Sequence, residues 1–292
     1  MALTEADTCR RFITPALVEA GWDLHQQILE QRYFTAGRVV VVGSRARRRT
    51  GKRADYLLRY RRDLPLAVVE AKADDEPAGS GLQQAIDYAT ILSLPFAYAT
   101  NGREIIEHDF VTGQERNLDR FPGPDELWAR WKAGEHVDDE LERCMLTPSY
   151  SDPNRKLRYY QTTAVNRAVE ALARGKERVL LTLATGTGKS FIAFQVCWRL
   201  WQARWNRKGS HQRPKILYLA DRTTLLSQPM LREFAPFGEA LHRIEAEVVT
   251  SREMYFATYQ QIARDESRPG TEGSGAYRVL TFLAKDGSIK TQ

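Results

Sequence analysis

The amino-terminal residues begin with a helical pattern of apolar and polar positions. Apolar side chains recur every three or four positions across residues 3–20. Thr4, followed three positions later by Asp7, is placed to cap the first turn, and Pro15 interrupts the pattern. The sequence therefore predicts an N-terminal helix with a disturbance near Pro15.

The pattern then changes to the two-residue period of β-strands. Short β-branched or alternating runs, separated by glycine, arginine-rich and proline-containing turns, predict strands at residues 37–43, 54–60 and 64–72. A helix over 80–93 follows, and then two strands around an Asn101-Gly102 turn. The resulting order is α-β-β-β-α-β-β.

A charged segment at 121–144 predicts two short helices that connect this part to the next. From about residue 157, helices alternate with apolar strands. The predicted helices are 161–175, 189–205 and 223–234, and the predicted strands are 178–184 and 214–221. Such alternation is typical of a parallel, doubly wound sheet.

Composition excludes several classes of protein. The chain has 292 residues, of which 42% are hydrophobic and 27% charged, and no apolar run has the length of a membrane span. We find no secretion signal at the N-terminus. Cys9, Cys144 and Cys197 lie far apart, which argues against a disulfide framework and a structural zinc site. We therefore expect a cytoplasmic protein with no membrane association.

The formal net charge of +6 indicates a weak preference for a polyanion. Within residues 44–53, six of ten side chains are Arg or Lys, and charges at that density repel unless something negative lies against them. Phosphates would serve, so a DNA contact is one interpretation. A solvated hairpin loop is the other, and the sequence leaves both open.

Residues 183–190, LATGTGKS, have the composition of a phosphate-binding loop. A glycine-bearing turn between a strand and a helix directs backbone N–H groups and the helix dipole at one point. Gly186 and Gly188 allow a tight turn, Lys189 can contact the β and γ phosphates, and Ser190 can bind Mg²⁺. The cofactor-binding residues predicted here are Thr185, Gly186, Thr187, Gly188, Lys189 and Ser190.

A second candidate site combines Asp55 with Glu70 and Lys72. Asp55 begins one predicted strand, and the other two residues end the next strand, fifteen positions on. Because side chains alternate along a strand, Glu70 and Lys72 share a face, and Asp55 on the adjacent strand can join them. Two carboxylates and an ammonium suit Mg²⁺-dependent hydrolysis of a phosphodiester.

The second half of the chain resembles superfamily 2 helicases. The phosphate loop is similar to the AxTGxGK[ST] form of these motors, and segments 218–228 and 256–260 resemble their motif Ia and the DNA-contacting motif after it. The resemblance implies a RecA-like first motor domain that binds ATP. It also implies that Gln161 reads the edge of the adenine.

The first half resembles nucleases. Asp55, Glu70 and Lys72 match the PD-(D/E)xK motif, with Ala54 where proline often stands, and the pair Gln84 and Tyr88 lies where RecB-like nucleases carry QxxxY. Residues 54–105 look like the N-terminal nuclease of the R (restriction) subunit of type I restriction enzymes, and the resemblance extends over most of residues 1 to about 265.

That resemblance implies a role for each site residue. Asp55 and Glu70 would bind Mg²⁺, Lys72 would assist the attacking water, and Gln84 and Tyr88 would position the scissile strand. Glu19 on the first helix would be the further acidic residue that such folds place near the metal. The implied activity is ATP-dependent translocation and cleavage of unmodified double-stranded DNA, together with methyltransferase and specificity subunits.

We therefore expect an α/β chain with a PD-(D/E)xK restriction-endonuclease-like domain at 1–115, a helical connector at 116–155 and an incomplete RecA-like P-loop domain with a parallel sheet at 156–292. No apolar strand ends in the Asp-Glu pair that hydrolyses ATP. The pairs Asp125-Glu126, Asp139-Glu140 and Asp265-Glu266 all lie elsewhere. This pattern resembles the front of a longer, truncated protein.

Two alternatives remain open. The first is a non-catalytic fragment that binds DNA and nucleotide without turnover. The second is a different helicase-nuclease, which the order of the domains disfavours, since such proteins usually carry the nuclease after the motor.

Overall fold

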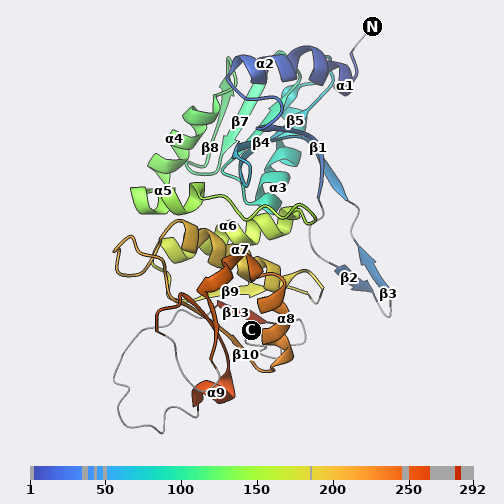
Figure 1. The fold of residues 1–292 in the computed structure, drawn as a ribbon. Coiled ribbons are helices and arrows are strands. Elements are labelled where there is room, and N and C mark those ends of the chain that lie inside the picture. The colour runs from blue at the N-terminus through green and yellow to red at the C-terminus, as the bar shows by residue number, and fades with distance from the viewer. Residues whose placement is uncertain are drawn as a thin grey trace. The chain divides into compact units, whose positions relative to one another are not determined.

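The computed structural model describes residues 3–34, 39–42, 45–48, 51–184, 186–244, 250–263 and 280–283, with backbone alone for 39–42, 45–48, 262–263 and 280–283. The chain divides into two compact units, Met1–Asp138 and Asp139–Gln292 (Figure 1). The segment expected to connect two domains is shared between them. Its first helix, α4 (Pro124–Gly134), belongs to the first unit, and α5 (Asp139–Leu146) begins the second.

The first unit is built on a six-stranded sheet in the order β1-β4-β5-β6-β7-β8. Its strands are β1 (Ile28–Phe34), β4 (Lys52–Arg61), β5 (Leu64–Ala71), β6 (Phe96–Thr100), β7 (Ile105–Asp109) and β8 (Gln114–Leu118). Neighbouring strands are antiparallel except β5 and β6, which are parallel. Helix α3 (Leu82–Leu92) makes the crossover between these two strands, as a parallel pair requires.

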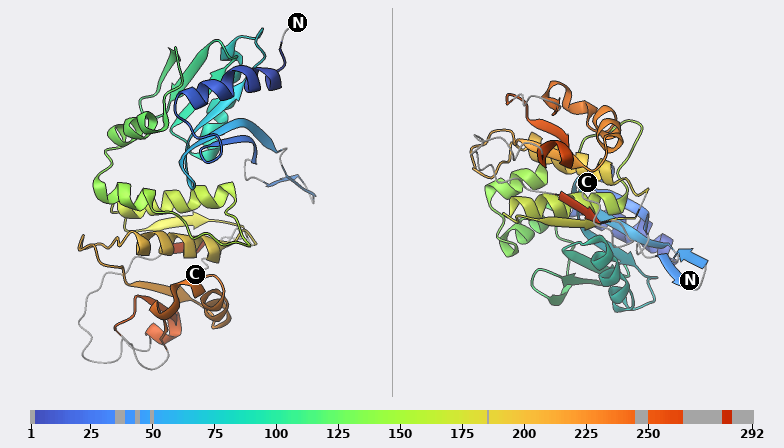
Figure 2. Two further views of the ribbon diagram at one scale, coloured as in Figure 1. Left: turned by 45° about the horizontal axis from the view of Figure 1, so that its top comes forward. Right: turned by 90° about the horizontal axis from the view of Figure 1, so that it is seen from below.

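Helices cover both faces of this sheet. Helix α3 packs on β5 and β6. The N-terminal helix lies across the opposite face (Figure 2), where Thr14 hydrogen-bonds Tyr56 at 2.9 Å. Helix α4 joins it there through Trp128, whose ring stacks on Tyr60 with centroids 4.9 Å apart. The sheet of the first unit is therefore covered by α3 on one face and by the N-terminal helix and α4 on the other.

The N-terminal helix confirms the predicted cap and the predicted disturbance. Thr4 accepts a hydrogen bond from the backbone N–H of Asp7 at the start of α1 (Glu5–Thr8). A π-helical turn, η1 (Cys9–Ile13), then precedes α2 (Thr14–Glu19). Pro15 has no N–H to donate, and the wide turn ends just before it, so the helix continues past the proline instead of breaking.

Three strands of the first unit were not predicted. Strands β1 and β8 are largely exposed, and β3 (Arg45–Arg48) carries three arginines. Edge strands of this kind lack the apolar alternation on which a strand prediction depends. Strand β3 pairs with β2 (Val39–Val42) as a separate antiparallel ribbon, which Figures 1 and 2 show projecting beyond the ends of β1 and β4.

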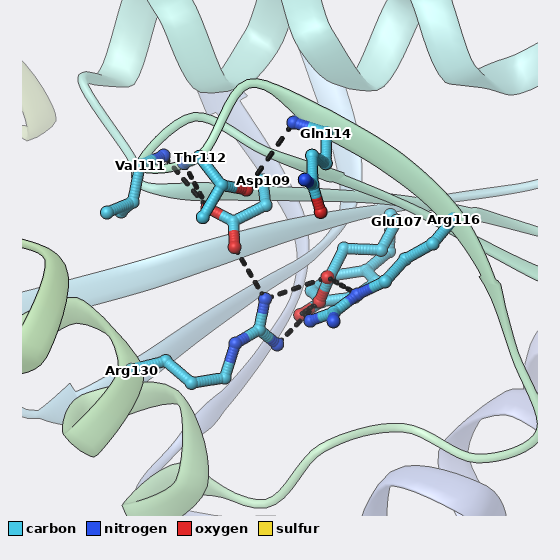
Figure 3. A network of polar contacts seen from close by, with 8 residues as sticks. Glu107, Asp109, Val111, Thr112, Gln114, Arg116 and Arg130 are labelled. Carbon is cyan, nitrogen blue, oxygen red and sulfur yellow. Dashed lines mark hydrogen bonds and ion pairs between the residues drawn. The ribbon is translucent and has the colours of Figure 1, made fainter.

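A buried ion network fastens α4 to the sheet of the first unit (Figure 3). The side chain of Glu107 on β7 is fully buried and accepts two hydrogen bonds from Arg130 on α4, at 2.8 and 2.9 Å. Arg116 and Tyr98 also donate to it, and Arg130 reaches Asp109 as well. Burial alone would raise the pKa of Glu107, but these donors lower it overall.

The second unit has parallel strands, as the alternating pattern predicted. Among its described residues every strand pair is parallel: β13 (Leu280–Leu283) with β9 (Val179–Thr182), and β12 (Met254–Thr258) with both β10 (Ile216–Ala220) and β11 (Leu241–Arg243). The helices are α5, α6 (Tyr159–Ala173), α7 (Lys189–Gln202), α8 (Thr224–Leu231) and α9 (Tyr259–Ala263), with the 3-10 segment η3 at Ala235–Ala240.

An aromatic core organises the second unit around α7. Phe194 contacts Phe234 and Phe237, with ring centroids 5.5 and 5.8 Å apart. Trp201 and Trp205 are also buried. Every helix that the structure describes is too short or too polar to cross a lipid bilayer.

Candidate functional site

The pairing of β4 with β5 brings the two candidate carboxylates together. Tyr56 pairs with Val69 in an antiparallel register, so Asp55 lies level with Glu70 at the next position. Asp55 also accepts a hydrogen bond from the backbone N–H of Ala71, at 2.9 Å from its Oδ2. The carboxylate of Asp55 is thereby fixed beside the segment that holds Glu70 and Lys72.

Glu70 is a buried acid. It is 4% exposed, and its Oε2 atom is buried with no hydrogen-bond partner among the described residues. Burial, followed by repulsion from Asp55, raises the pKa of Glu70 to about 8. Burial likewise raises the pKa of Asp55. Two carboxylates that resist ionisation at adjacent positions are an arrangement that a cation would stabilise.

Lys72 supplies the positive charge of this cluster. Its Nζ lies 3.8 Å from Oε1 of Glu70 and 3.6 Å from Oε1 of Glu5. Glu5 is on α1, so the first turn of the N-terminal helix reaches the site. Glu19, the acid that the sequence suggested, is an exposed residue of α2, and no described contact links it to the cluster.

Besides Glu5, Gln31 is a residue of the site that was not predicted from the sequence. Its backbone is in the left-handed region, with φ of +50°, and its side-chain Nε2 donates to Oδ1 of Asp55 at 3.0 Å. A non-glycine residue in this region costs on the order of 1 kcal/mol. The irregular backbone of β1 at Gln31 thus directs the side-chain amide of this residue to the carboxylate of Asp55.

Gln84 and Tyr88 lie on one face of α3, as predicted from their spacing. The Nε2 of Gln84 donates to Oε1 of Glu70 and to the hydroxyl of Tyr88, the latter at 3.0 Å. Burial, followed by the charge of Glu70, raises the pKa of Tyr88. The five residues predicted for this site, Asp55, Glu70, Lys72, Gln84 and Tyr88, are therefore brought together by β4, β5 and α3.

The raised pKa of Glu70 gives a testable pH dependence of stability. Between the ordinary value of 4.5 and the folded value of about 8, the folded chain holds a proton that the unfolded chain has lost. The free energy of unfolding of the metal-free protein therefore falls as the pH rises through this interval, by at most about 1.4 kcal/mol per pH unit from this group. Above the folded pKa the contribution of this group is constant.

We expect Glu70→Gln to remove this pH-dependent loss, because an amide mimics the protonated acid. Calorimetric unfolding of both proteins in EDTA, from pH 5 to pH 9, measures the difference. Parallel curves for the two proteins would mean that Glu70 titrates normally.

The predicted phosphate loop of the second unit is a glycine-bearing turn between a strand and a helix. It follows β9 and leads into α7, which begins at Lys189. Gly186 and Gly188 adopt φ of +78° and +86°, conformations that favour glycine. Thr185 lies outside the described residues. Ser190, in the first turn of α7, hydrogen-bonds Tyr218.

Gln161, on α6, makes a hydrogen bond to this loop. Its Nε2 donates to the carbonyl oxygen of Thr187 at 2.8 Å, and its Oε1 accepts from the backbone N–H of Arg158 at 3.0 Å. A Cβ at position 188 would come within 2.7 Å of that Nε2, which is a second reason for glycine there. Both polar atoms of the Gln161 side chain therefore make hydrogen bonds, and one of these bonds holds the backbone of the loop.

Other candidates contribute no site. Among the residues that the structure describes, no group of three or more His, Cys, Asp or Glu side chains has the geometry of a metal site. Of the Asp-Glu pairs, Asp125-Glu126 and Asp139-Glu140 lie in the first turns of α4 and α5, and Asp265-Glu266 falls outside the described residues.

Comparisons with known proteins follow the same division. Residues 154–282 match the family described as "Type III restriction enzyme, res subunit". The EcoAI endonuclease subunit of a type I restriction enzyme, from Escherichia coli, is 40% identical over 276 residues, which are 90% of this chain and 33% of that protein. The EcoKI endonuclease subunit, from Escherichia coli strain K12, is 31% identical over 149 residues, which are 47% of this chain and 12% of that protein.

A solved structure gives the same assignment. It is described as a fragment of an HsdR subunit of a type I restriction enzyme from Vibrio vulnificus YJ016, is 52% identical, and superposes with a TM-score of 0.78 over 92% of this chain and 50% of that one. This chain thus spans about a third of the first curated relative and half of the solved fragment. Over the residues that align, the chain belongs to the endonuclease (HsdR) subunits of type I restriction enzymes.

Proposed function

We propose that the first unit is a metal-dependent nuclease domain of the PD-(D/E)xK type and that the cluster around Glu70 cleaves double-stranded DNA. The observation that carries the proposal is the pairing of Glu70, a buried acid with an unsatisfied oxygen, with Asp55 on the adjacent strand and Lys72 two positions away. A purely structural ion pair would not leave a buried carboxylate oxygen without a donor.

The residues fit a divalent cation. Asp55 and Glu70 offer oxygen ligands of the kind that Mg²⁺ prefers, and Glu70 has an unpartnered oxygen to give. When bound, the cation would neutralise charge on the scissile phosphate and acidify a water molecule. Asp55 is held for this role by the N–H of Ala71 and the amide of Gln31.

The remaining side chains have roles that follow from their contacts. Lys72, close to Glu70 and only slightly exposed, can hold the attacking water and accept or pass on its proton. The amide nitrogen of Gln84 donates to both Glu70 and Tyr88. It therefore sets the distance between the acid that would bind the metal and the tyrosine that would contact DNA. Tyr88 would then contact the scissile strand.

We propose further that the second unit holds ATP and Mg²⁺ at its phosphate loop and forms part of a DNA translocase. This motor would work with methyltransferase and specificity subunits on unmodified DNA. The support is the loop conformation, the start of α7 at Lys189 and the parallel strands around it. A non-catalytic DNA-binding and nucleotide-binding role is the competing function.

Metal binding and DNA cleavage by this chain test the nuclease proposal together. We expect calorimetry to detect Mn²⁺ or Mg²⁺ binding that is lost in Asp55→Asn and Glu70→Gln, and retained in Asp87→Asn, whose carboxylate lies on the exposed face of α3. Supercoiled DNA should be cut only with metal present. If neither metal binding nor cleavage depends on Asp55 and Glu70, the nuclease proposal is wrong.

A change at Gly81 tests whether the position of Lys72 matters. A Cβ at Gly81 would lie 3.0 Å from Cε of Lys72, too close without a shift of that side chain, whereas a Cβ at Gly79 would lie 3.6 Å from Ile106, an ordinary contact. We therefore expect Gly81→Ala to slow cleavage about 10- to 100-fold and Gly79→Ala to leave it unchanged. Initial rates of plasmid nicking measure both, and equal rates would show that Lys72 tolerates displacement.

A further inference from the structure

We propose that the first unit holds the phosphate backbone of duplex DNA on a basic edge of its sheet, formed by Arg32 and Tyr33 on β1 and by Lys52 and Arg53 on β4. The inference rests on the proposed nuclease function and specifies the surface over which DNA approaches Glu70. The four residues are called the basic edge below.

The positive charge of the chain is concentrated here. Residues 31–53 contain eight Arg or Lys side chains and no Asp or Glu. Because the whole chain carries +6 and this segment carries +8, the other residues together carry −2. A surplus of positive charge confined to one segment of the sequence indicates a local polyanionic partner, since a general contribution to solubility would not require clustering.

The strand register places two members of the basic edge, Tyr33 and Arg53, side by side. Tyr33 pairs with Arg53, and the neighbouring positions 34 and 52 also pair. Tyr33 is 71% exposed, unusually for a tyrosine, and the guanidinium of Arg53 lies over its ring, 5.7 Å from the centroid. An exposed ring that supports an arginine offers a cation and an aromatic surface to the same ligand. This combination is common where proteins contact nucleic acid.

Lys52 connects the basic edge to the candidate catalytic site. Its Nζ lies 5.1 Å from the centroid of the Tyr88 ring. Tyr88 receives a hydrogen bond from Gln84, whose amide also donates to Glu70. A phosphate held by Lys52 would therefore lie next to the residues that hold Glu70.

Beyond the basic edge the chain continues as the β2–β3 ribbon, in which Val39 pairs with Arg48 and Val42 with Arg45. A ribbon of two strands is marginally stable by itself. Duplex DNA presents phosphates at regular intervals on both strands, so it matches a linear array of cations better than the irregular charges of an acidic protein surface do.

The test compares two pairs of arginines of equal charge. Arg32→Gln/Arg53→Gln removes two cations from the basic edge. Arg103→Gln/Arg120→Gln removes two exposed arginines that form ion pairs with Asp74 and Glu126. Binding of the whole chain to a labelled DNA duplex is measured by fluorescence anisotropy in EDTA over a range of salt concentrations.

We expect the first pair to weaken binding on the order of tenfold at low salt and to reduce the slope of log affinity against log salt by about 1.8. The control pair should change neither quantity. Circular dichroism checks that both variants are folded. Equal slopes for the two variants would overturn the proposal, because Arg32 and Arg53 would then contribute no more phosphate contacts than two arginines outside the basic edge.

A photo-crosslinking amino acid at Tyr33 gives a local reading, with the same group at Arg120 as the control. Crosslinks to duplex DNA are expected at position 33 alone, and crosslinks to an acidic protein without crosslinks to DNA would contradict the proposal. Loss of cleavage in Glu70→Gln with an unchanged salt slope in the arginine variant would retain the nuclease and exclude the basic edge. Crosslinks at position 33 without metal-dependent cleavage would support the basic edge and exclude the nuclease.

Discussion

Replacing Lys72 with methionine is expected to reduce metal-dependent DNA cleavage by about 10²- to 10⁴-fold, the usual effect of removing a group that transfers or positions a proton. Methionine keeps most of the length and the apolar contacts of the lysine side chain. It removes the ammonium that lies 3.8 Å from Glu70 and 3.6 Å from Glu5. Single-turnover cleavage of plasmid DNA measures the rate.

The affinity for the metal ion should not fall with the cleavage rate in Lys72→Met. Lys72 is a positive charge close to the acid that would hold the cation, so its removal should leave affinity for Mg²⁺ unchanged or increase it. Lys132→Met, on α4, is the matched control and should leave both cleavage and metal binding intact. Equal residual cleavage by the unmodified chain and Lys72→Met would favour the non-catalytic alternative.

The substitution Arg130→Met is expected to destabilise the first unit by about 3–5 kcal/mol, the usual cost of breaking a buried ion pair from one side. Glu107 is fully buried and receives two hydrogen bonds from Arg130. Without this partner the buried carboxylate keeps only Arg116 and Tyr98 as donors, and it either stays charged with fewer hydrogen bonds or takes up a proton. Urea unfolding at neutral pH measures the change in the free energy of unfolding.

Arg120→Met provides the control, because Arg120 forms an exposed ion pair with Glu126 that should contribute less than about 1 kcal/mol. The double variant Arg130→Met/Glu107→Gln should recover part of the lost stability, since it no longer buries a carboxylate that has lost two of its donors. An Arg130→Met protein as stable as the Arg120→Met protein would mean that the network has little net value.

The sequence predicted the elements whose side chains alternate strongly. Strand β4, with alternate residues buried, and helix α3 were both found where the pattern placed them. Strand β8 was not predicted, because all five of its residues are at least partly exposed and its pattern is that of a loop. The role of Arg130 was also missed. A single arginine on a charged helix has no local signal of burial, which depends on a carboxylate 23 positions earlier in the chain.

The candidate nuclease site was predictable as far as its residues lie on neighbouring strands and one helical face. Asp55, Glu70, Lys72, Gln84 and Tyr88 satisfy that condition. Glu5 and Gln31 do not, because the first depends on which turn of the N-terminal helix meets the sheet and the second on an irregular backbone. Neither property leaves a trace in spacing or composition.

The contact between Gln161 and Thr187 has a consequence for how the phosphate loop meets an anion. Across a trans peptide, the carbonyl of one residue and the N–H of the next point in opposite directions. The Thr187 carbonyl points at Gln161 and the Tyr160 hydroxyl, so the amide hydrogen of Gly188 must point away from α6. By holding the Thr187 carbonyl, Gln161 fixes the direction of the Gly188 N–H, although it makes no hydrogen bond to that group. A phosphate that enters the loop would therefore meet an N–H group that is already oriented.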